Sequence, residues 1–301
     1  MKSLLALIFL ALIATDLYAD LVEDAPKDCA YCEEWNNPQE PFRIYGNTWY
    51  VGTEGLGSVL VVTDAGLILI DGALAQSAPL IVENIRQIGF DPLEIKYILN
   101  SHAHYDHAGG IAALQKYTGT QVLASEGSVA VLRSGELADS DPQFNFGVEA
   151  NRFPPIGNVG LFGNGESLTL GDTTLTAHYT PGHTPGGTTW TWQSCEDSTC
   201  LNMVYADSLS AVSAEGFLFS NPDLSPNNAQ QILTSTSLIR ELPCDVLMAP
   251  HPFLIKMEEK LAARAVNPDI NPFIDPAACA AYADYFDAWL ARRLEEENAV
   301  H

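Results

Sequence analysis

The sequence predicts an α/β protein in which two mixed β-sheets pack together with helices outside, a four-layer αββα sandwich. Short segments rich in β-branched and aromatic residues follow one another, separated by Gly, Asn or Asp. Segments with apolar residues at helical spacing stand between some of them. Strands followed by helices then recur in the second half of the chain, which indicates two sheets rather than one.

The first half is expected to begin as a meander and to continue with alternating helices and strands. A helix is expected over 79–89, where apolar residues from Leu80 to Ile88 recur at helical spacing. A second helix is expected over 111–117, between two short apolar segments. The expected strands are 42–45, 48–52, 58–63, 67–70, 95–99 and 121–124.

The second half repeats this pattern. Helices are expected over 227–242 and over 279–297, the latter amphipathic and closing the chain. The segment 143–165, with its Gly, Asn and paired Pro residues, is expected to be a long loop of the functional or mobile kind. No stretch reads as a linker, so residues 20–301 are expected to form a single domain. The expected strands are 167–170, 173–179, 188–192, 203–205 and 245–249.

Residues 1–19 have the pattern of a secretory signal peptide. Lys2 precedes an apolar run from Leu4 to Ala14, and Ala19 ends a stretch suited to signal peptidase. The run is shorter than the ~20 residues that a membrane-spanning helix needs. We therefore expect cleavage after Ala19, a periplasmic location, and no membrane association of the mature chain.

The net charge of −24, from 14 basic and 38 acidic residues, argues against nucleic acid as a partner. An acidic surface of this kind keeps a protein soluble, and a monomer is the default expectation. Six cysteines in an exported chain predict disulfides. A redox role for Cys29-Ala-Tyr-Cys32 is the alternative, but the strand-then-helix setting for it is missing. Proximity in sequence predicts Cys29–Cys32 and Cys195–Cys200, which leaves Cys244–Cys279.

The segment from His102 to His107 carries the strongest functional signal, because it holds three of the seven histidines. It follows a buried-looking strand and precedes a helix, where α/β sheets place their sites. Residues two apart in an extended segment point the same way, so His102 and His104 can share one ion. Asp106 and His107 then project elsewhere, toward a second ion. Histidine with aspartate is the ligand style of catalytic zinc, which keeps a position for water; a chance surface cluster is the weaker alternative.

The other histidines differ in context. His183 lies in Pro-Gly-His-Thr-Pro-Gly-Gly, a rigid turn that ends a strand, and is a candidate ligand. His251 lies in Ala-Pro-His-Pro, also at the end of an expected strand, and is a second candidate. His178 falls within a strand and is expected to be structural, and His301 is the last residue.

The order and spacing of these residues resemble the metallo-β-lactamase superfamily over nearly all of the expected mature chain. The segment Tyr205-Ala-Asp207-Ser208-Leu-Ser210 is similar to the third subclass of class B β-lactamases, in which serine replaces a cysteine zinc ligand. The resemblance implies two Zn²⁺ ions, the first held by His102, His104 and His183, and the second by Asp106, His107 and His251. It also implies that Ser208 and Ser210 bind the substrate carboxylate, and it agrees with a disulfide between Cys244 and Cys279.

The function implied is that of a zinc-dependent β-lactamase that confers antibiotic resistance by hydrolysing penicillins, cephalosporins or carbapenems. In that mechanism a hydroxide held by zinc attacks the β-lactam carbonyl, and Asp106 orients it as well as binding the second ion. The enzyme alternative is an exported dizinc esterase, lactonase or thioesterase of the same fold. A protein that stores or senses zinc is the non-enzyme alternative.

Asp207 and Ser208 distinguish the two enzyme functions. Glyoxalase-like relatives carry an aspartate in this strand that bridges both metals, and Asp207 could be aligned with it. Adjacent strand residues face opposite ways, so both cannot point at the site from a regular strand. We favour Ser208 as the residue that faces the metals, with Asp207 as a buried, hydrogen-bonded residue.

Overall fold

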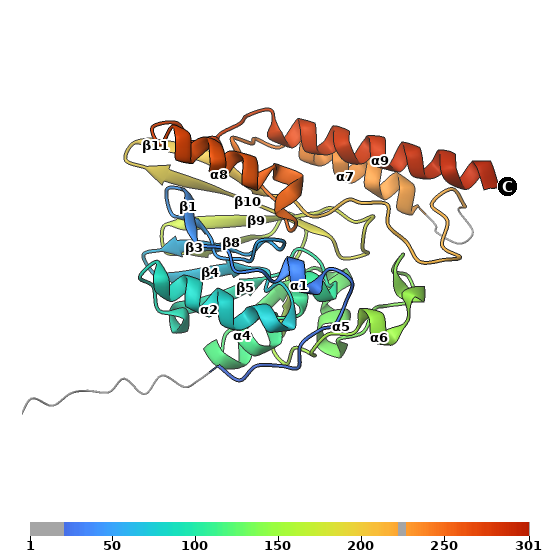
Figure 1. The fold of residues 1–301 in the computed structure, drawn as a ribbon, viewed down its shortest axis with the longest axis horizontal. Coiled ribbons are helices and arrows are strands. Elements are labelled where there is room, and N and C mark those ends of the chain that lie inside the picture. Colours follow the sequence, from blue (N-terminus) through green and yellow to red (C-terminus); the bar gives the residue numbers. More distant parts are fainter. Residues whose placement is uncertain (1–20, 222–226, 301) are drawn as a thin grey trace, which may run out of the picture.

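The computed structural model describes residues 21–221 and 227–300, which form two β-sheets with helices on their outer faces (Figure 1). The layers run helices, sheet, sheet, helices, which confirms the expected αββα sandwich. The expected signal peptide, 1–19, and His301 lie outside the described residues. None of the described helices is long and apolar enough to cross a membrane.

The first sheet contains seven strands that lie side by side in chain order. The first four form an antiparallel meander, and the last three continue parallel to the fourth. Parallel neighbours require a crossover connection, and helices α2 (Ala78–Gln87), α4 (Ile111–Thr118) and α5 (Glu126–Ser134) lie in those connections. The strands are β1 (Phe42–Tyr45), β2 (Thr48–Tyr50), β3 (Val59–Thr63), β4 (Gly66–Ile70), β5 (Ile95–Leu99), β6 (Gln121–Ala124) and β7 (Val159–Leu161).

The second sheet contains five strands in the order β12-β11-β10-β9-β8. Four of them are antiparallel, and the last pairs parallel to β11 after helix α7 (Asn228–Glu241). The strands are β8 (Ser167–Leu170), β9 (Thr173–Tyr179), β10 (Thr188–Glu196), β11 (Thr199–Tyr205) and β12 (Val246–Met248).

Two apolar cores fill the three spaces between the four layers. One contains residues from both sheets and from the helices over the second sheet, with Trp190 and Tyr205 among its largest fully buried side chains. The other fills the space between the first sheet and helices such as α2 and α4. Strand β4, inside the first sheet, is therefore apolar on both faces from Leu67 to Ile70.

Helix α9 (Ala278–Val300) is the long outer helix that lies beside α7 over the second sheet (Figure 1). The Cys244–Cys279 disulfide joins the start of this helix to the chain just before β12. Cys29–Cys32 and Cys195–Cys200 are also formed, so all three expected pairings are confirmed.

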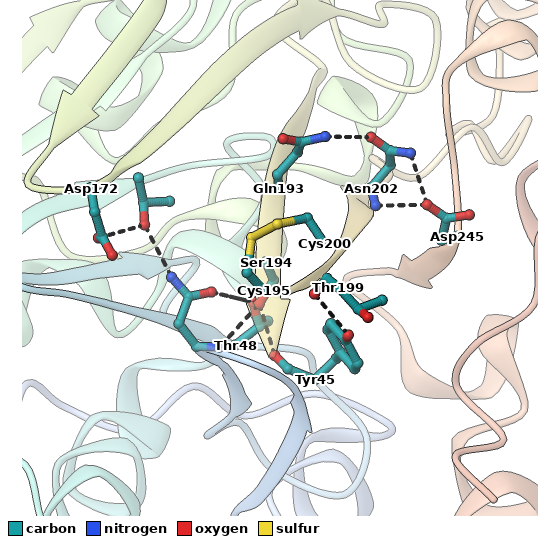
Figure 2. Close-up of a disulfide and its surroundings, with 12 residues drawn as sticks. Tyr45, Thr48, Asp172, Gln193, Ser194, Cys195, Thr199, Cys200, Asn202 and Asp245 are labelled. Atoms are coloured by element: carbon teal, nitrogen blue, oxygen red, sulfur yellow. Dashed lines mark hydrogen bonds between the residues drawn. A yellow bond between two sulfur atoms is a disulfide. The ribbon is translucent and has the colours of Figure 1, made fainter. Parts of the chain in front are cut away.

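The tip of the β10–β11 hairpin connects the two sheets, as Figure 2 shows around Cys195 and Cys200. Ser194 Oγ donates to the carbonyl oxygen of Tyr45 over 2.9 Å. Tyr45 in turn donates through its hydroxyl to the carbonyl oxygen of Thr199 over 3.1 Å. The first residue of β10 lies at the other end of this hairpin, where the candidate site forms.

The expected long loop over 143–165 is partly wrong. It contains short helical turns at Phe144–Phe146 and α6 (Val148–Asn151), and its later part forms β7 at the edge of the first sheet. Strand β7 is held by backbone pairing with β6, and only Val159 of its three residues is buried, so no apolar alternation marked it. Helix α8 (Met257–Val266) was not expected either, because Met257 is the one residue that it buries fully.

Candidate metal centre

The histidine motif lies at the carboxyl end of β5, where the chain turns into the short helix α3 (Tyr105–Ala108). Backbone packing fixes this turn. The peptide of Gly72, just after β4, donates to the carbonyl oxygen of His107 over 2.8 Å. A Cβ at Gly110 would lie 2.2 Å from the carbonyl oxygen of Gly72, so only glycine allows this approach. The motif is thereby pressed against the end of the first sheet.

Six of the predicted site residues converge there from three loops. His102, His104 and His183 form one group whose candidate ligand atoms all lie within 4.8 Å of one another. His102, Asp106 and His107 form a second group under the same limit. All five side chains are buried.

His251 lies beside the second group without belonging to it. It follows β12, and its Nε2 is 3.5 Å from Asp106 Oδ2, while its ring centroid is 4.8 Å from that of His107. The rings of Trp35 and Phe253 lie 5.5 and 5.6 Å from its own. Asp106 is thus placed between two imidazoles, one from the motif and one from the second half of the chain.

Hydrogen bonds orient three of the imidazoles. His102 Nδ1 lies 2.7 Å from Asp207 Oδ1, and His104 Nε2 lies 3.2 Å from Asp141 Oδ2. His183 Nδ1 donates to the carbonyl oxygen of Ser210 over 2.9 Å. Each bond occupies one ring nitrogen and leaves the other for an ion, the arrangement common to metal-binding histidines.

The surroundings of His102 Nε2 indicate that a metal ion fits between the three imidazoles of the first group. This atom is buried and lacks a hydrogen-bond partner anywhere in the described part of the chain. A buried polar atom left unpaired costs free energy, and a cation between the three imidazoles of the first group would provide a partner. Four imidazoles and a carboxylate within this space match the donor set that zinc prefers.

The ionisation of the site agrees with this use. Burial, with the nearby His104, lowers the pKa of His183 to about 3, and burial with His107 lowers that of His251 to about 4. Both imidazoles are therefore neutral at pH 7, the form that binds a metal. Burial would raise the pKa of Asp106, but His107, His251 and His104 outweigh it and lower the pKa, so this carboxylate is ionised.

The chain after β11 supplies the remaining predicted residues. Asp207 is fully buried and contacts the motif through its 2.7 Å hydrogen bond to His102, not as a member of either ligand group. Gly187 makes room for it, since a Cβ there would lie 2.4 Å from Asp207 Oδ2. Ser208 Oγ is buried and has no hydrogen-bond partner among the described residues, and Ser210 Oγ is 3.1 Å from His183 Nδ1.

Burial lowers the pKa of His102 and raises the pKa of Asp207, so the pair does not exist as two buried charges. The two groups are joined by the 2.7 Å hydrogen bond between Nδ1 and Oδ1. A cation on His102 Nε2 would favour the form in which Nδ1 carries the proton and Asp207 the charge.

Sequence analysis missed two residues that support the site. Asp71, after β4, accepts from Ser101 N over 2.8 Å and from Tyr205 OH over 2.9 Å, and so joins the ends of both sheets beneath His102. Burial raises the pKa of Asp71. Asp141 lies 37 residues from His104 and within the chain between α5 and α6, with no local pattern to mark it. The only signal for Asp71 was an aspartate-glycine pair at the end of an apolar strand.

His178 behaves as expected of a structural residue. Its Nε2 lies 2.9 Å from Thr191 Oγ1 on the neighbouring strand, and it belongs to neither ligand group.

Comparisons with known proteins show which family has this fold and arrangement of residues. A family model described as the metallo-beta-lactamase superfamily matches residues 52–196. The solved structure of Rm3 metallo-beta-lactamase is similar at 45% identity and a TM-score of 0.86, over 90% of this chain and 99% of that one. MEM-A1, a subclass B3 metallo-beta-lactamase isolated from a soil metagenome library, is similar at 42% identity and a TM-score of 0.84. The match covers 89% of this chain and 100% of that one.

Curated relatives match over a shorter region. N-acyl homoserine lactonase AttM of Agrobacterium fabrum is 33% identical over 110 residues, which is 35% of this chain. Hydroxyacylglutathione hydrolase of Anaeromyxobacter dehalogenans is 34% identical over 98 residues. The chain spans only 38% and 29% of the lengths of these two proteins. The near-complete alignments at 45% and 42% identity decide the family: the chain belongs to the metallo-β-lactamase superfamily and is similar to its subclass B3 enzymes.

Proposed function

We propose that the chain is a zinc-dependent β-lactamase that binds two zinc ions and hydrolyses the β-lactam amide. The protein would act in the periplasm as a monomer after loss of residues 1–19, and its substrates would be penicillins, cephalosporins or carbapenems. The observation that carries the proposal is the pair of ligand groups that share His102, formed in a chain that aligns over its length with metallo-β-lactamases.

The residues that would hold the first ion are His102, His104 and His183. Those that would hold the second are Asp106 and His107, with His251 brought in beside Asp106. When bound, zinc lowers the pKa of a water to near 7 and polarises the substrate carbonyl, so that hydrolysis needs no protein nucleophile.

The chain's own groups do the positioning. Asp106, ionised between His107 and His251, would accept a hydrogen bond from the attacking water and so fix its direction of attack. Asp141, Asp207 and the backbone of Ser210 would keep three imidazoles in the tautomers that ligate. Ser208 and Ser210 would bind the carboxylate of the substrate, directly or through water.

The position of Asp207 supports a β-lactamase over the ester-hydrolysing alternative. Its Oδ1 is held by His102 Nδ1, the ring nitrogen that does not face the ion, and Asp207 belongs to neither ligand group, whereas an aspartate that bridges two metals must present an oxygen to both ions. The observation that favours the alternative is the match to an N-acyl homoserine lactonase, at 33% identity over 110 residues. That match covers 35% of the chain. The two functions differ in substrate and are separated by assay.

The test is hydrolysis of a carbapenem, a chromogenic cephalosporin and an N-acyl homoserine lactone by purified protein lacking residues 1–19, with and without a zinc chelator. We expect turnover of a β-lactam at kcat/KM of about 10⁴ M⁻¹s⁻¹ or more, lost with chelator and restored by zinc. Turnover of the lactone alone would replace the proposal with the lactonase function. Absence of turnover with two zinc ions bound would refute it.

A further inference from the structure

Helix α9 carries a buried carboxylate near its C-terminal end. Glu297 is only 5% exposed, although its neighbours Glu295 and Glu296 are exposed. Burying a carboxylate costs free energy unless hydrogen bonds replace its hydration. Its partners therefore indicate what this end of the helix is built to hold.

Its backbone partners belong to the chain that follows β11, residues 206–221, here named the β11 loop. Glu297 Oε2 accepts from the peptide N–H of Ser220 over 2.7 Å, and Oε1 accepts from that of Phe219 over 3.1 Å. Arg293 donates to Glu297 over 2.6 Å and also reaches Ser213 Oγ over 3.0 Å. Hydrogen bonds to charged groups are the strong ones, so Arg293 and Glu297 form one anchor for the far end of the loop.

The same helix holds the near end. The hydroxyl of Tyr282, close to the start of α9, donates to the carbonyl oxygen of Asp207 over 3.0 Å. The Cys244–Cys279 disulfide fixes this start. One rigid helix, which Figure 1 shows on the outside of the second sheet, thus binds the β11 loop at 207 and again at 213–220.

The segment between the two attachments contacts the candidate metal centre. The carbonyl oxygen of Ser210 accepts from His183. The peptide N–H of Ala214 donates to the carbonyl oxygen of Pro142 over 2.9 Å, and Pro142 follows Asp141, the partner of His104. Displacing the loop would therefore move Ser208 and Ser210 and the backbone beside Asp141.

We propose that Arg293 and Glu297 are positioning residues for substrate binding, which set the place of the β11 loop from a helix that supplies none of the proposed metal ligands. The proposal rests on the proposed β-lactamase function, since it assigns Ser208 and Ser210 to the substrate carboxylate. Helix α9 stays docked without the anchor, because Phe286 and Leu290 are buried in the core and the disulfide remains.

The variant Glu297→Gln tests this with little change in shape. The two backbone donors use different carboxylate oxygens, so an amide must turn its NH₂ toward one of them. We expect KM for a β-lactam to rise about fivefold or more while kcat stays within about twofold, as for a group that serves binding. Glu296→Gln is the matched control, with the same charge change at an exposed position. Arg293→Met is expected to act like Glu297→Gln, with exposed Arg292→Met as its control.

Amide hydrogen exchange on the zinc-loaded protein gives the second readout. We expect Glu297→Gln to raise exchange about tenfold or more across 206–214 as well as at Phe219 and Ser220. Unchanged KM in both anchor variants would overturn the proposal, even with a lower Tm. If the parent protein hydrolyses no β-lactam, the proposed function fails by itself. The positioning role is then judged by exchange: a rise reaching 206–214 supports it, and a rise confined to 217–221 overturns it.

Discussion

Asp141→Asn should weaken binding of the first zinc ion although the residue is not itself a proposed ligand. Asp141 Oδ1 accepts from the peptide N–H of Gln143 over 2.8 Å, and His104 Nε2 lies 3.3 Å from Oδ1 and 3.2 Å from Oδ2. An asparagine has one acceptor oxygen, so its NH₂ must face either a backbone N–H or the ring N–H of His104. The conflict would be relieved if the ring proton of His104 moved from Nε2 to Nδ1. Nδ1 would then have no lone pair with which to bind zinc.

Changes of this kind typically cost about 10- to 100-fold in metal affinity, which corresponds to about 1.4 to 2.8 kcal/mol. The assay is competition for zinc against a chromophoric chelator, which resolves the two ions by their affinities. The second ion should be held as in the parent protein. Asp139→Asn is the matched control, because Asp139 is exposed two residues away. Equal affinity for both ions in Asp141→Asn and the control would refute the reasoning.

Three further variants probe the site. Asp106→Ala should lose most turnover and one zinc ion while the circular dichroism spectrum is kept; near-parental hydrolysis with one ion lost would contradict its role. Replacing Ser208 and Ser210 with Ala should raise KM more than it lowers kcat, and a fall in kcat at constant KM would instead place them in the chemistry. Gly187→Ala should lower the free energy of unfolding by about 1–3 kcal/mol and weaken zinc binding, because its Cβ would lie 2.4 Å from both Asp207 Oδ2 and the carbonyl oxygen of Thr180; a thermal melt and zinc titration like the parent's would show that the close packing around Gly187 is not required.

The metal centre was predictable where its residues carry a local pattern. The spacing from His102 to His107 and the rigid turn around His183 can be recognised from the sequence alone. The structure brings these residues together. Asp141 could not be found this way, because its relation to His104 exists only once the chain between α5 and α6 folds back over the motif. The choice between Asp207 and Ser208 depended on how the strand ends, which alternation alone does not fix.

The elements of the fold also differ in whether a local sequence pattern predicts them. Strand β4 is a continuous apolar run buried from Leu67 to Ile70, and β5 buries Ile95, Ile98 and Leu99, so their composition marked them as strands. Strand β7 owes its existence to the free edge of β6, and helix α8 lies on the surface with a single buried residue. Such elements are selected by tertiary contacts rather than by their own sequence.

The Cys244–Cys279 disulfide links the redox state of the surroundings to the catalytic end of the molecule. It closes 35 residues, and restricting an unfolded loop of that length is worth about 4 kcal/mol. The bond fixes the start of α9 close to Tyr282, whose hydroxyl holds the carbonyl oxygen of Asp207. Because thiols stay reduced in the cytoplasm, a chain that folds there lacks this covalent support for the backbone behind His102. The finished geometry of the metal centre then depends on the compartment in which the chain folds, as well as on its sequence.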